Sequence, residues 1–163
     1  MYLTITYLDL DCPKPYGLIG SIEVQGYRKV NSMSESVNEK TVKSFIDGIN
    51  RQNIKALENL FSEDLVVIYP DLRKEDKTDY LKHWAHEWGA FPDGYATIEH
   101  ILSKGDIVMT EWHWKGTWKK EYQGRPPTNK AYESIPGVFV IELENAKIKL
   151  IRYYWLPQLL FSS

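Results

Sequence analysis

The chain contains a single cysteine, Cys12, among its 163 residues. One cysteine cannot build an internal disulfide framework or a zinc site with several cysteine ligands, so both are excluded. Long apolar runs are also missing, because no stretch approaches the ~18 consecutive apolar residues of a membrane-spanning helix. The first residues lack the basic segment, apolar run and cleavage site of a secretory signal. We therefore expect a soluble, cytoplasmic protein with no membrane partner.

An excess of basic charge is absent as well. Lys and Arg number 20 against 22 Asp and Glu, which gives a formal net charge of -2. Proteins that bind nucleic acid usually carry a basic patch or stripe, so we expect no nucleic-acid partner. The hydrophobic and charged fractions, 43% and 26%, are ordinary globular values and exclude wholesale disorder.

Aromatic residues are plentiful: six Trp, eleven Tyr and five Phe make up 13% of the chain. Aromatic side chains fill cores and interfaces, and they line pockets that hold flat apolar ligands. The sequence therefore predicts a ligand pocket with an aromatic wall. Its expected lining residues are Trp84, Trp88, Trp112, Trp114, Trp118 and Trp155.

The first 33 residues differ in pattern from the rest, with two short apolar alternations separated by a Pro- and Gly-containing break. We expect residues 1–33 to be an appendage and residues 34–163 to form one domain. Met33 directly precedes the first helix signature, so the residues before it could be an extension of the natural reading frame.

Helix signals begin at Ser36, which forms a capping box with Glu39. Apolar residues at helical spacing continue this helix to about Gln52, and Asn53 predicts the N-cap of a second, short helix. Thr78 is expected to cap a third helix after a charged loop. The expected apolar stripe of this third helix is Leu81, Trp84, Ala85 and Trp88.

Strand-like segments dominate the second half of the chain. After a short run at residues 65–69, turn residues separate four longer segments at residues 95–103, 107–118, 131–143 and 147–155. This order predicts an α+β domain in which helices cover one face of an antiparallel meander. Pro136-Gly137 suggests an edge position or a bulge in the third of these strands.

Four short motifs occur in a familiar order: Phe91-Pro92-Asp93, Gly105-Asp106-Ile107-Val108, Lys115-Gly116-Thr117-Trp118 and Tyr122-Gln123-Gly124-Arg125-Pro126-Pro127-Thr128. The succession resembles the SnoaL-like polyketide cyclases of the nuclear transport factor two-like superfamily. The resemblance implies a cystatin-like fold, in which a curved antiparallel sheet wraps over three N-terminal helices as a cone-shaped barrel with a central pocket. It also implies a homodimer and ring closure of a polyketide without metal or cofactor.

The chain departs from the family at the positions that carry chemistry. Trp118 replaces the histidine of the family's Gly-Thr-His motif. The family's last-strand aspartate should fall near Trp155 or Leu156, where the sequence has no carboxylate. The usual acid/base pair is therefore not implied for this chain.

Other residues must then supply any acid or base. His83 and Glu87 are one helical turn apart on the third helix, so the carboxylate could orient the imidazole. The favoured alternative is a solvated polar face opposite Trp84 and Trp88. The order of the histidines and the glutamate does not match a metalloprotease helix, so we expect no metal.

The strand at 107–118 offers a second candidate pair. Glu111 and His113 share one face, and Thr110, Trp112, Trp114 and Trp118 share the other. We favour tryptophans turned inward, which leaves Glu111 and His113 as exposed cross-strand partners. In the reverse orientation, Glu111 and His113 become a buried acid/base pair.

Asp93, Arg152 and Tyr154 complete the catalytic candidates, each with a structural alternative: a turn cap, a cross-strand ion pair, and packing. Two hypotheses follow. The protein is a cofactor-independent cyclase or isomerase that acts on a small apolar or aromatic metabolite, or it binds such a ligand without catalysis.

Overall fold

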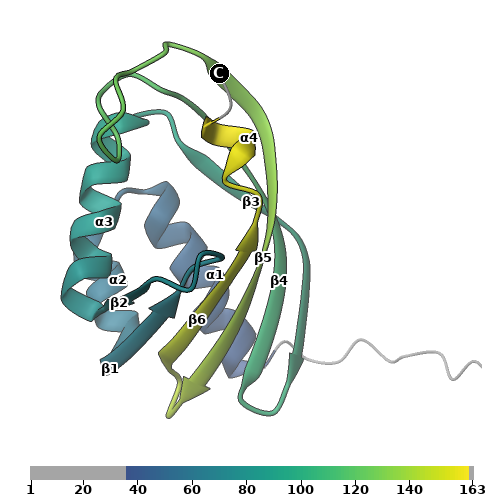
Figure 1. Cartoon of the computed structure of the whole chain (residues 1–163). Coiled ribbons are helices and arrows are strands. Elements are labelled where there is room, and N and C mark those ends of the chain that lie inside the picture. The colour runs from purple at the N-terminus through teal and green to yellow at the C-terminus, as the bar shows by residue number, and fades with distance from the viewer. Residues whose placement is uncertain (1–35, 162–163) are drawn as a thin grey trace, which may run out of the picture. The chain divides into compact units, whose positions relative to one another are not determined.

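The computed structural model describes residues 36–161, and the expected appendage at residues 1–33 lies outside them. In this part of the chain, three helices cover one face of a curved, open sheet (Figure 1). The helices are α1 (Val37–Asn50), α2 (Ile54–Leu60) and α3 (Lys77–Ala90), and a short α4 (Gln158–Phe161) follows the last strand. The α+β arrangement expected from the sequence is confirmed.

The sheet has six strands in the order β2-β1-β6-β5-β4-β3. The strands are β1 (Phe61–Ile68), β2 (Lys74–Asp76), β3 (Tyr95–Lys104), β4 (Ile107–Thr117), β5 (Ala131–Glu144) and β6 (Lys147–Trp155). The last four form the expected antiparallel meander. The first strand joins β6 in parallel, so the sheet is mixed rather than purely antiparallel.

Side-chain caps fix where the helices begin. The Ser36 hydroxyl accepts a hydrogen bond from the Glu39 amide at 3.0 Å, which confirms the capping box. The third helix begins earlier than expected, because Asp76 and not Thr78 caps it, with Asp79 N donating to Asp76 at 2.9 Å. The charged loop before it contains β2, which pairs with β1.

The inner face of the sheet carries the tryptophans of β4. Trp112 and Trp114 are buried and Glu111 is exposed, as the favoured orientation predicted. No bulge lies at Pro136-Gly137, because β4 pairs with both residues without a register shift. The expected edge position holds for Pro136 alone, since β6 pairs with β5 only from Gly137 onward. Gly137 instead makes room for an indole: a Cβ on it would lie 2.2 Å from Trp112 Cζ2.

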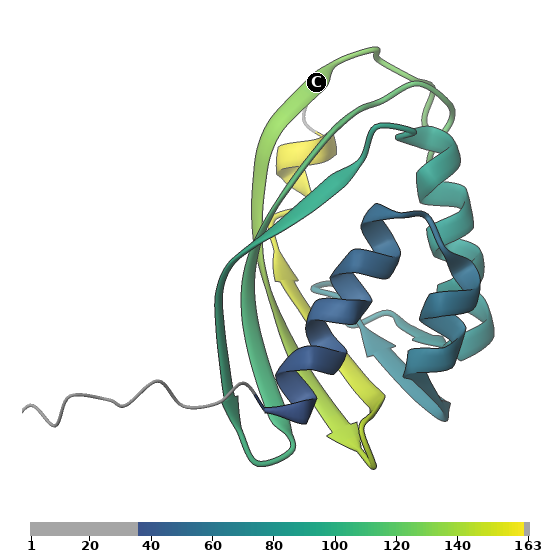
Figure 2. The same cartoon turned by 180° about the vertical axis from the view of Figure 1, so that it is seen from behind.

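The core fills the space between the helices and the inner face, where α1 packs against β3 and β4 (Figure 2). Its most deeply buried members include Val42, Phe45, Leu57, Val108, Ile141, Ile148 and Ile151. No helix within residues 36–161 is long and apolar enough to cross a membrane.

Candidate functional site

A cavity of about 280 Å³ opens between α3, the end of α1 and the inner face of the sheet. One part of its wall is apolar and half aromatic: Ile46, Ile49, Phe91, Ala96, Trp112, Trp114, Ile135 and Phe139. Another part is polar: Tyr69, Asp71, Arg73, His83, Glu87 and Tyr122. A flat apolar ligand with one polar end matches this division.

Four of the six tryptophans expected in the wall line this cavity, namely Trp84, Trp112, Trp114 and Trp155. Trp88 and Trp118 are not among the lining residues. The Trp118 indole N–H donates to the Lys120 carbonyl at 2.6 Å, so this residue anchors the loop that follows β4.

The third helix turns its polar residues toward the cavity. Its buried residues are Tyr80, Trp84 and Ala90, and His83 and Glu87 lie on the same side with side chains only 13% and 17% exposed. The expected solvated polar face for His83 and Glu87 is therefore wrong. The helix can bury this face because its polar groups find partners on the β1–β2 hairpin and on the loop after β4.

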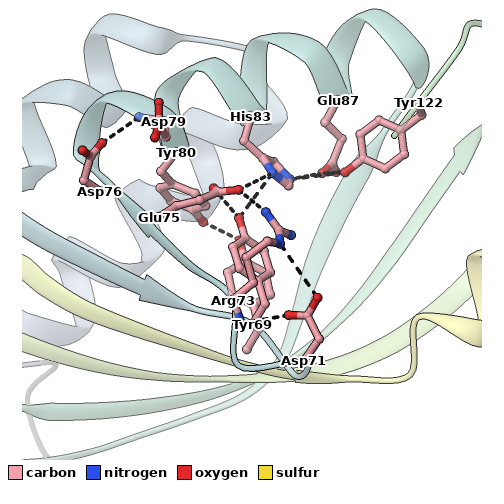
Figure 3. A network of polar contacts seen from close by, with 11 residues as sticks. Tyr69, Asp71, Arg73, Glu75, Asp76, Asp79, Tyr80, His83, Glu87 and Tyr122 are labelled. Carbon is pink, nitrogen blue, oxygen red and sulfur yellow. Dashed lines mark hydrogen bonds and ion pairs between the residues drawn. The ribbon is translucent and has the colours of Figure 1, made fainter. Parts of the chain in front are cut away.

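His83 lies between two carboxylates and two phenols (Figure 3). Its Nδ1 is 3.4 Å from Glu75 Oε1 and 3.3 Å from the Tyr69 hydroxyl. Its Nε2 is 3.2 Å from both Glu87 Oε2 and the Tyr122 hydroxyl. Each ring nitrogen thus faces one carboxylate and one hydroxyl.

The β1–β2 hairpin supplies one side of this network. Tyr69 donates to Glu75 Oε2 at 2.7 Å, and an Arg73 guanidinium N–H donates to Glu75 Oε1. The Arg73 guanidinium also lies 4.0 Å from the centre of the Tyr69 ring. Glu75 does not line the cavity, so it contacts His83 from the side away from the cavity.

The loop after β4 supplies the other side. Tyr122 donates to Glu87 Oε2 at 3.2 Å, and its ring packs edge-on against Phe91. Lys119 N donates to the Ala90 carbonyl at 2.7 Å, which ties the start of the loop to the end of α3. Tyr122 is 4% exposed although it comes from a surface loop.

The network favours a protonated His83. Burial alone would lower the pKa of His83, but the hydrogen bonds and charges of Glu75 and Glu87 outweigh it and raise the pKa to about 9. Burial opposes ionisation of Glu75 too, yet hydrogen bonds from His83 and Tyr69 leave its pKa below the ordinary value. Burial raises the pKa of Tyr69 and of Tyr122, so both phenols stay neutral and can donate.

Sequence reasoning missed Glu75 and Arg73, and it treated Tyr122 only as part of a motif. Glu75 belongs to a charged run that reads as a solvated loop, and its partner His83 is on another element. The only sequence signal for this site was the kind of residues present: a histidine, a glutamate and several tyrosines occur on or near the third helix.

The second candidate pair lies away from the cavity. His113 Nδ1 is hydrogen-bonded to Ser134 Oγ on the outer face of the sheet. Glu111 Oε2 lies 2.8 Å from His100 Nδ1, and both side chains are exposed. Neither His113 nor Glu111 is among the residues that line the inner cavity.

The remaining candidates also lie elsewhere. Asp93 accepts hydrogen bonds from Thr117 N and Oγ1 at 2.7 and 2.6 Å, which lower the pKa of this carboxyl and tie the α3–β3 loop to the end of β4. Arg152 pairs with Glu142 at 2.6 Å on the outer face, and Tyr154 is 54% exposed there. Of the six candidate catalytic residues, His83 alone lines the inner cavity.

Within residues 36–161, no group of three or more His, Cys, Asp or Glu side chains has an arrangement that could hold a metal ion. The chemistry available in the polar wall is that of a buried imidazolium, a carboxylate that reaches the cavity, and neutral phenols. Such groups move protons and hold oxygen atoms.

Known proteins share first the fold of this chain and then its family. The fold is that of the nuclear transport factor two-like and cystatin-like proteins, shared with a protein of unknown function from Cytophaga hutchinsonii (TM-score 0.58, 15% identity, covering 80% of this chain and 99% of that one). The family model of the SnoaL-like domain matches residues 42–151, more than half of the chain. The chain therefore belongs to the SnoaL-like family. No curated protein sequence matches it.

Two solved structures illustrate the likeness. AclR from Streptomyces galilaeus, named as a candidate hydroxylase, superposes with a TM-score of 0.70 at 19% identity and covers 79% of this chain and 96% of its own. A protein from Jannaschia sp. CCS1, named as a candidate SnoaL-like polyketide cyclase, gives 0.68 at 20% identity, covering 76% and 88%. Identities this low show the fold alone.

Proposed function

We propose that this protein is a cofactor-independent cyclase or isomerase that acts on a small apolar, polyketide-like metabolite bound in the inner cavity. The observation that carries the proposal is the position of His83 in the cavity wall, between Glu87, which also lines the cavity, and Glu75 behind it. Names of structural relatives that include polyketide cyclases agree with this class of reaction.

The proposed step is an enolisation, which both ring closure and isomerisation require. The Glu87 carboxylate takes a proton from the carbon beside a ligand carbonyl, and protonated His83 gives its proton to the carbonyl oxygen. The C–H bond breaks, an O–H bond forms, and the electron pair becomes the C=C bond of an enol. Glu75, held by Arg73 and Tyr69, positions the imidazole and stabilises its charge.

Hydrogen–deuterium exchange tests this step without knowledge of the natural substrate. β-Tetralone, a bicyclic ketone that enolises readily, is incubated in deuterium oxide, and loss of its α-protons is followed by NMR. We expect wild-type protein to accelerate the exchange and His83→Gln to lose that acceleration by about 100-fold. His113→Gln, altered on the outer face, is the control and retains it. Equal rates for the two variants would contradict the assignment.

A non-catalytic binding protein is the second candidate, and one observation favours it. Both ring nitrogens of His83 already contact a carboxylate and a phenol, and the chain has Trp155 and Leu156 where the family's aspartate is expected. In that case the protein binds β-tetralone but exchanges none of its protons. A binding isotherm beside the exchange assay separates the two candidates.

We also propose that the protein forms the homodimer that its family implies. The outer face of the sheet carries exposed apolar side chains, such as Met109, Tyr154 and Leu156 at 48%, 54% and 63%. A hollow of about 540 Å³ lies on the same face, lined in part by Val138 and Arg152. Light scattering should give twice the chain mass of 19.1 kDa. A monomer that persists at high concentration would exclude the dimer.

A further inference from the structure

The polar wall of the cavity is balanced in charge before any ligand binds. Two negative charges, on Glu75 and Glu87, face two positive charges, on Arg73 and protonated His83. Asp71, which adds a further negative charge, has a side chain 67% exposed and so interacts mainly with solvent. Each of the two cations already contacts a carboxylate, so neither is left to neutralise an anionic ligand.

The donors of His83, Tyr69 and Tyr122 are committed as well. The Tyr69 hydroxyl proton goes to Glu75, and the Tyr122 hydroxyl proton goes to Glu87. Both N–H groups of protonated His83 point at the same carboxylates and phenol oxygens. A ligand that accepts a hydrogen bond from these groups must displace one of these contacts. Elsewhere in the lining, the buried indole N–H groups of Trp84 and Trp112 have no partner within residues 36–161.

Among the buried carboxylates of the wall, one acceptor remains open. Both contacts of the Glu87 carboxylate, with His83 and Tyr122, use Oε2. Its Oε1 has no hydrogen bond to any residue within 36–161, and it is not among the buried atoms that lack a partner. Since Glu87 lines the cavity, Oε1 is available to a ligand there.

From this balance we propose that the cavity recognises an uncharged ring compound through a hydroxyl that donates a hydrogen bond to Glu87 Oε1, as a phenol or an enol does. A carboxylate would bring a second anion beside Glu87 with no free cation to meet it. An ammonium group would unbalance a neutral network and lose its hydration in an apolar cavity. An ether or ketone would leave Glu87 Oε1 without a donor.

This inference deepens the proposed function, because an enol is the product of the proposed proton transfer. The contact with Glu87 applies to the resting network, in which Glu87 is ionised and His83 is protonated. The preference for a hydroxyl concerns binding only. It can hold even if the protein proves to be a binder without catalysis.

Calorimetric titration with matched naphthalene probes tests the preference. β-Naphthol has the shape of the enol of β-tetralone and carries the donor. Its comparators are the methyl ether, which only accepts, the carboxylate β-naphthoate, and the cation β-naphthylmethylammonium. At neutral pH we expect β-naphthol to bind at least ~10-fold more tightly than each comparator, the usual effect of one unmatched buried polar group.

Glu87→Gln tests whether Glu87 carries the preference. The amide removes one negative charge and can donate, so the ratio of the β-naphthol affinity to the β-naphthoate affinity should fall by about 10-fold. Glu99→Gln is the matched control, because Glu99 is exposed on β3 and is not a lining residue. The control should keep the wild-type ratio.

The outcomes separate the two proposals. Binding of β-naphthoate or of the ammonium probe as tightly as β-naphthol overturns the hydroxyl preference and leaves the enolisation assay standing. An unchanged ratio in Glu87→Gln overturns the role of Glu87. If no probe binds, the inference that the cavity takes an aromatic ligand is overturned, and the proposed function with it. Tight β-naphthol binding without β-tetralone exchange supports the preference and removes only catalysis.

Discussion

Two histidine–glutamate contacts on opposite faces of the sheet show what burial does to the same chemistry. On the outer face, His100 Nδ1 lies 2.8 Å from Glu111 Oε2, and the side chains are 78% and 48% exposed. In the cavity wall, His83 lies 3.2 Å from Glu87 and 3.4 Å from Glu75, but all three side chains are at most 17% exposed. The shorter contact is the weaker one, because water screens it.

The buried network differs also in its supports. Arg73, Tyr69 and Tyr122 satisfy the carboxylate oxygens that face His83, so no member is left without a partner for its charge. The outer pair has no such surroundings. The stability of a charge in the cavity wall therefore depends on the neighbouring side chains, whereas the stability of a charge on the outer face does not.

The largest effect should come from breaking the buried network. Glu75→Gln removes the carboxylate behind His83 and leaves Arg73 without its closest partner. Loss of one partner from a buried charge pair costs about 3 to 5 kcal/mol, so the free energy of unfolding should fall by that order. Urea denaturation measures it. A loss below about 1 kcal/mol would show that His83 does not rely on Glu75.

The next effect is a dependence of stability on pH. Because the folded-state pKa of His83 is about 9, above its ordinary 6.5, its contribution is complete below pH 6.5 and is lost as the pH rises through 9. The loss should approach about 3 kcal/mol. Unfolding curves between pH 6 and 10 should show a decline that His83→Gln lacks. Parallel curves for both proteins would contradict the raised pKa.

A smaller effect should follow from crowding the apolar wall. Gly137→Ala places a Cβ 2.2 Å from Trp112 Cζ2, so the indole or the strand must shift at a cost of about 1 to 3 kcal/mol. Gly89→Ala, in α3, is the control because its Cβ meets no atom within 4 Å. A more stable helix is expected there, by up to about 1 kcal/mol. Equal stability of the two variants would refute the close packing of Trp112 on Gly137.

The smallest effect should come from the outer pair. Glu111→Gln removes the partner of His100 in water, so the free energy of unfolding should change by less than about 0.5 kcal/mol. The same urea denaturation as for Glu75→Gln measures it. A change as large as that of the buried variant would erase the distinction between the two faces.

Local signals in the sequence predicted the fold well. The capping box at Ser36, the alternation along β4 and the turns between the last strands each depend on a few neighbouring residues. The orientation of α3 was predicted only in part. Leu81, Trp84 and Trp88 of its expected apolar stripe pack on the core. Tyr80 and His83 are turned inward as well, which the apolar pattern did not indicate.

The reason is that a polar face can be buried when partners arrive from elsewhere in the chain. Glu75 comes from a hairpin strand that reads as a charged loop, and Tyr122 comes from a loop that reads as exposed. Their distances from His83 depend on how the sheet curves under the helix. Periodicity along one helix carries no information on this, so the site appeared only in three dimensions.

The central claim is that His83 stays protonated in the cavity wall at neutral pH, and NMR titration of its imidazole tests it most directly. The chain has only four histidines, so the His83→Gln spectrum assigns the signal. We predict a midpoint near 9 for His83. A midpoint at or below 6.5 would contradict the account, because a neutral imidazole could not supply the proton for enolisation.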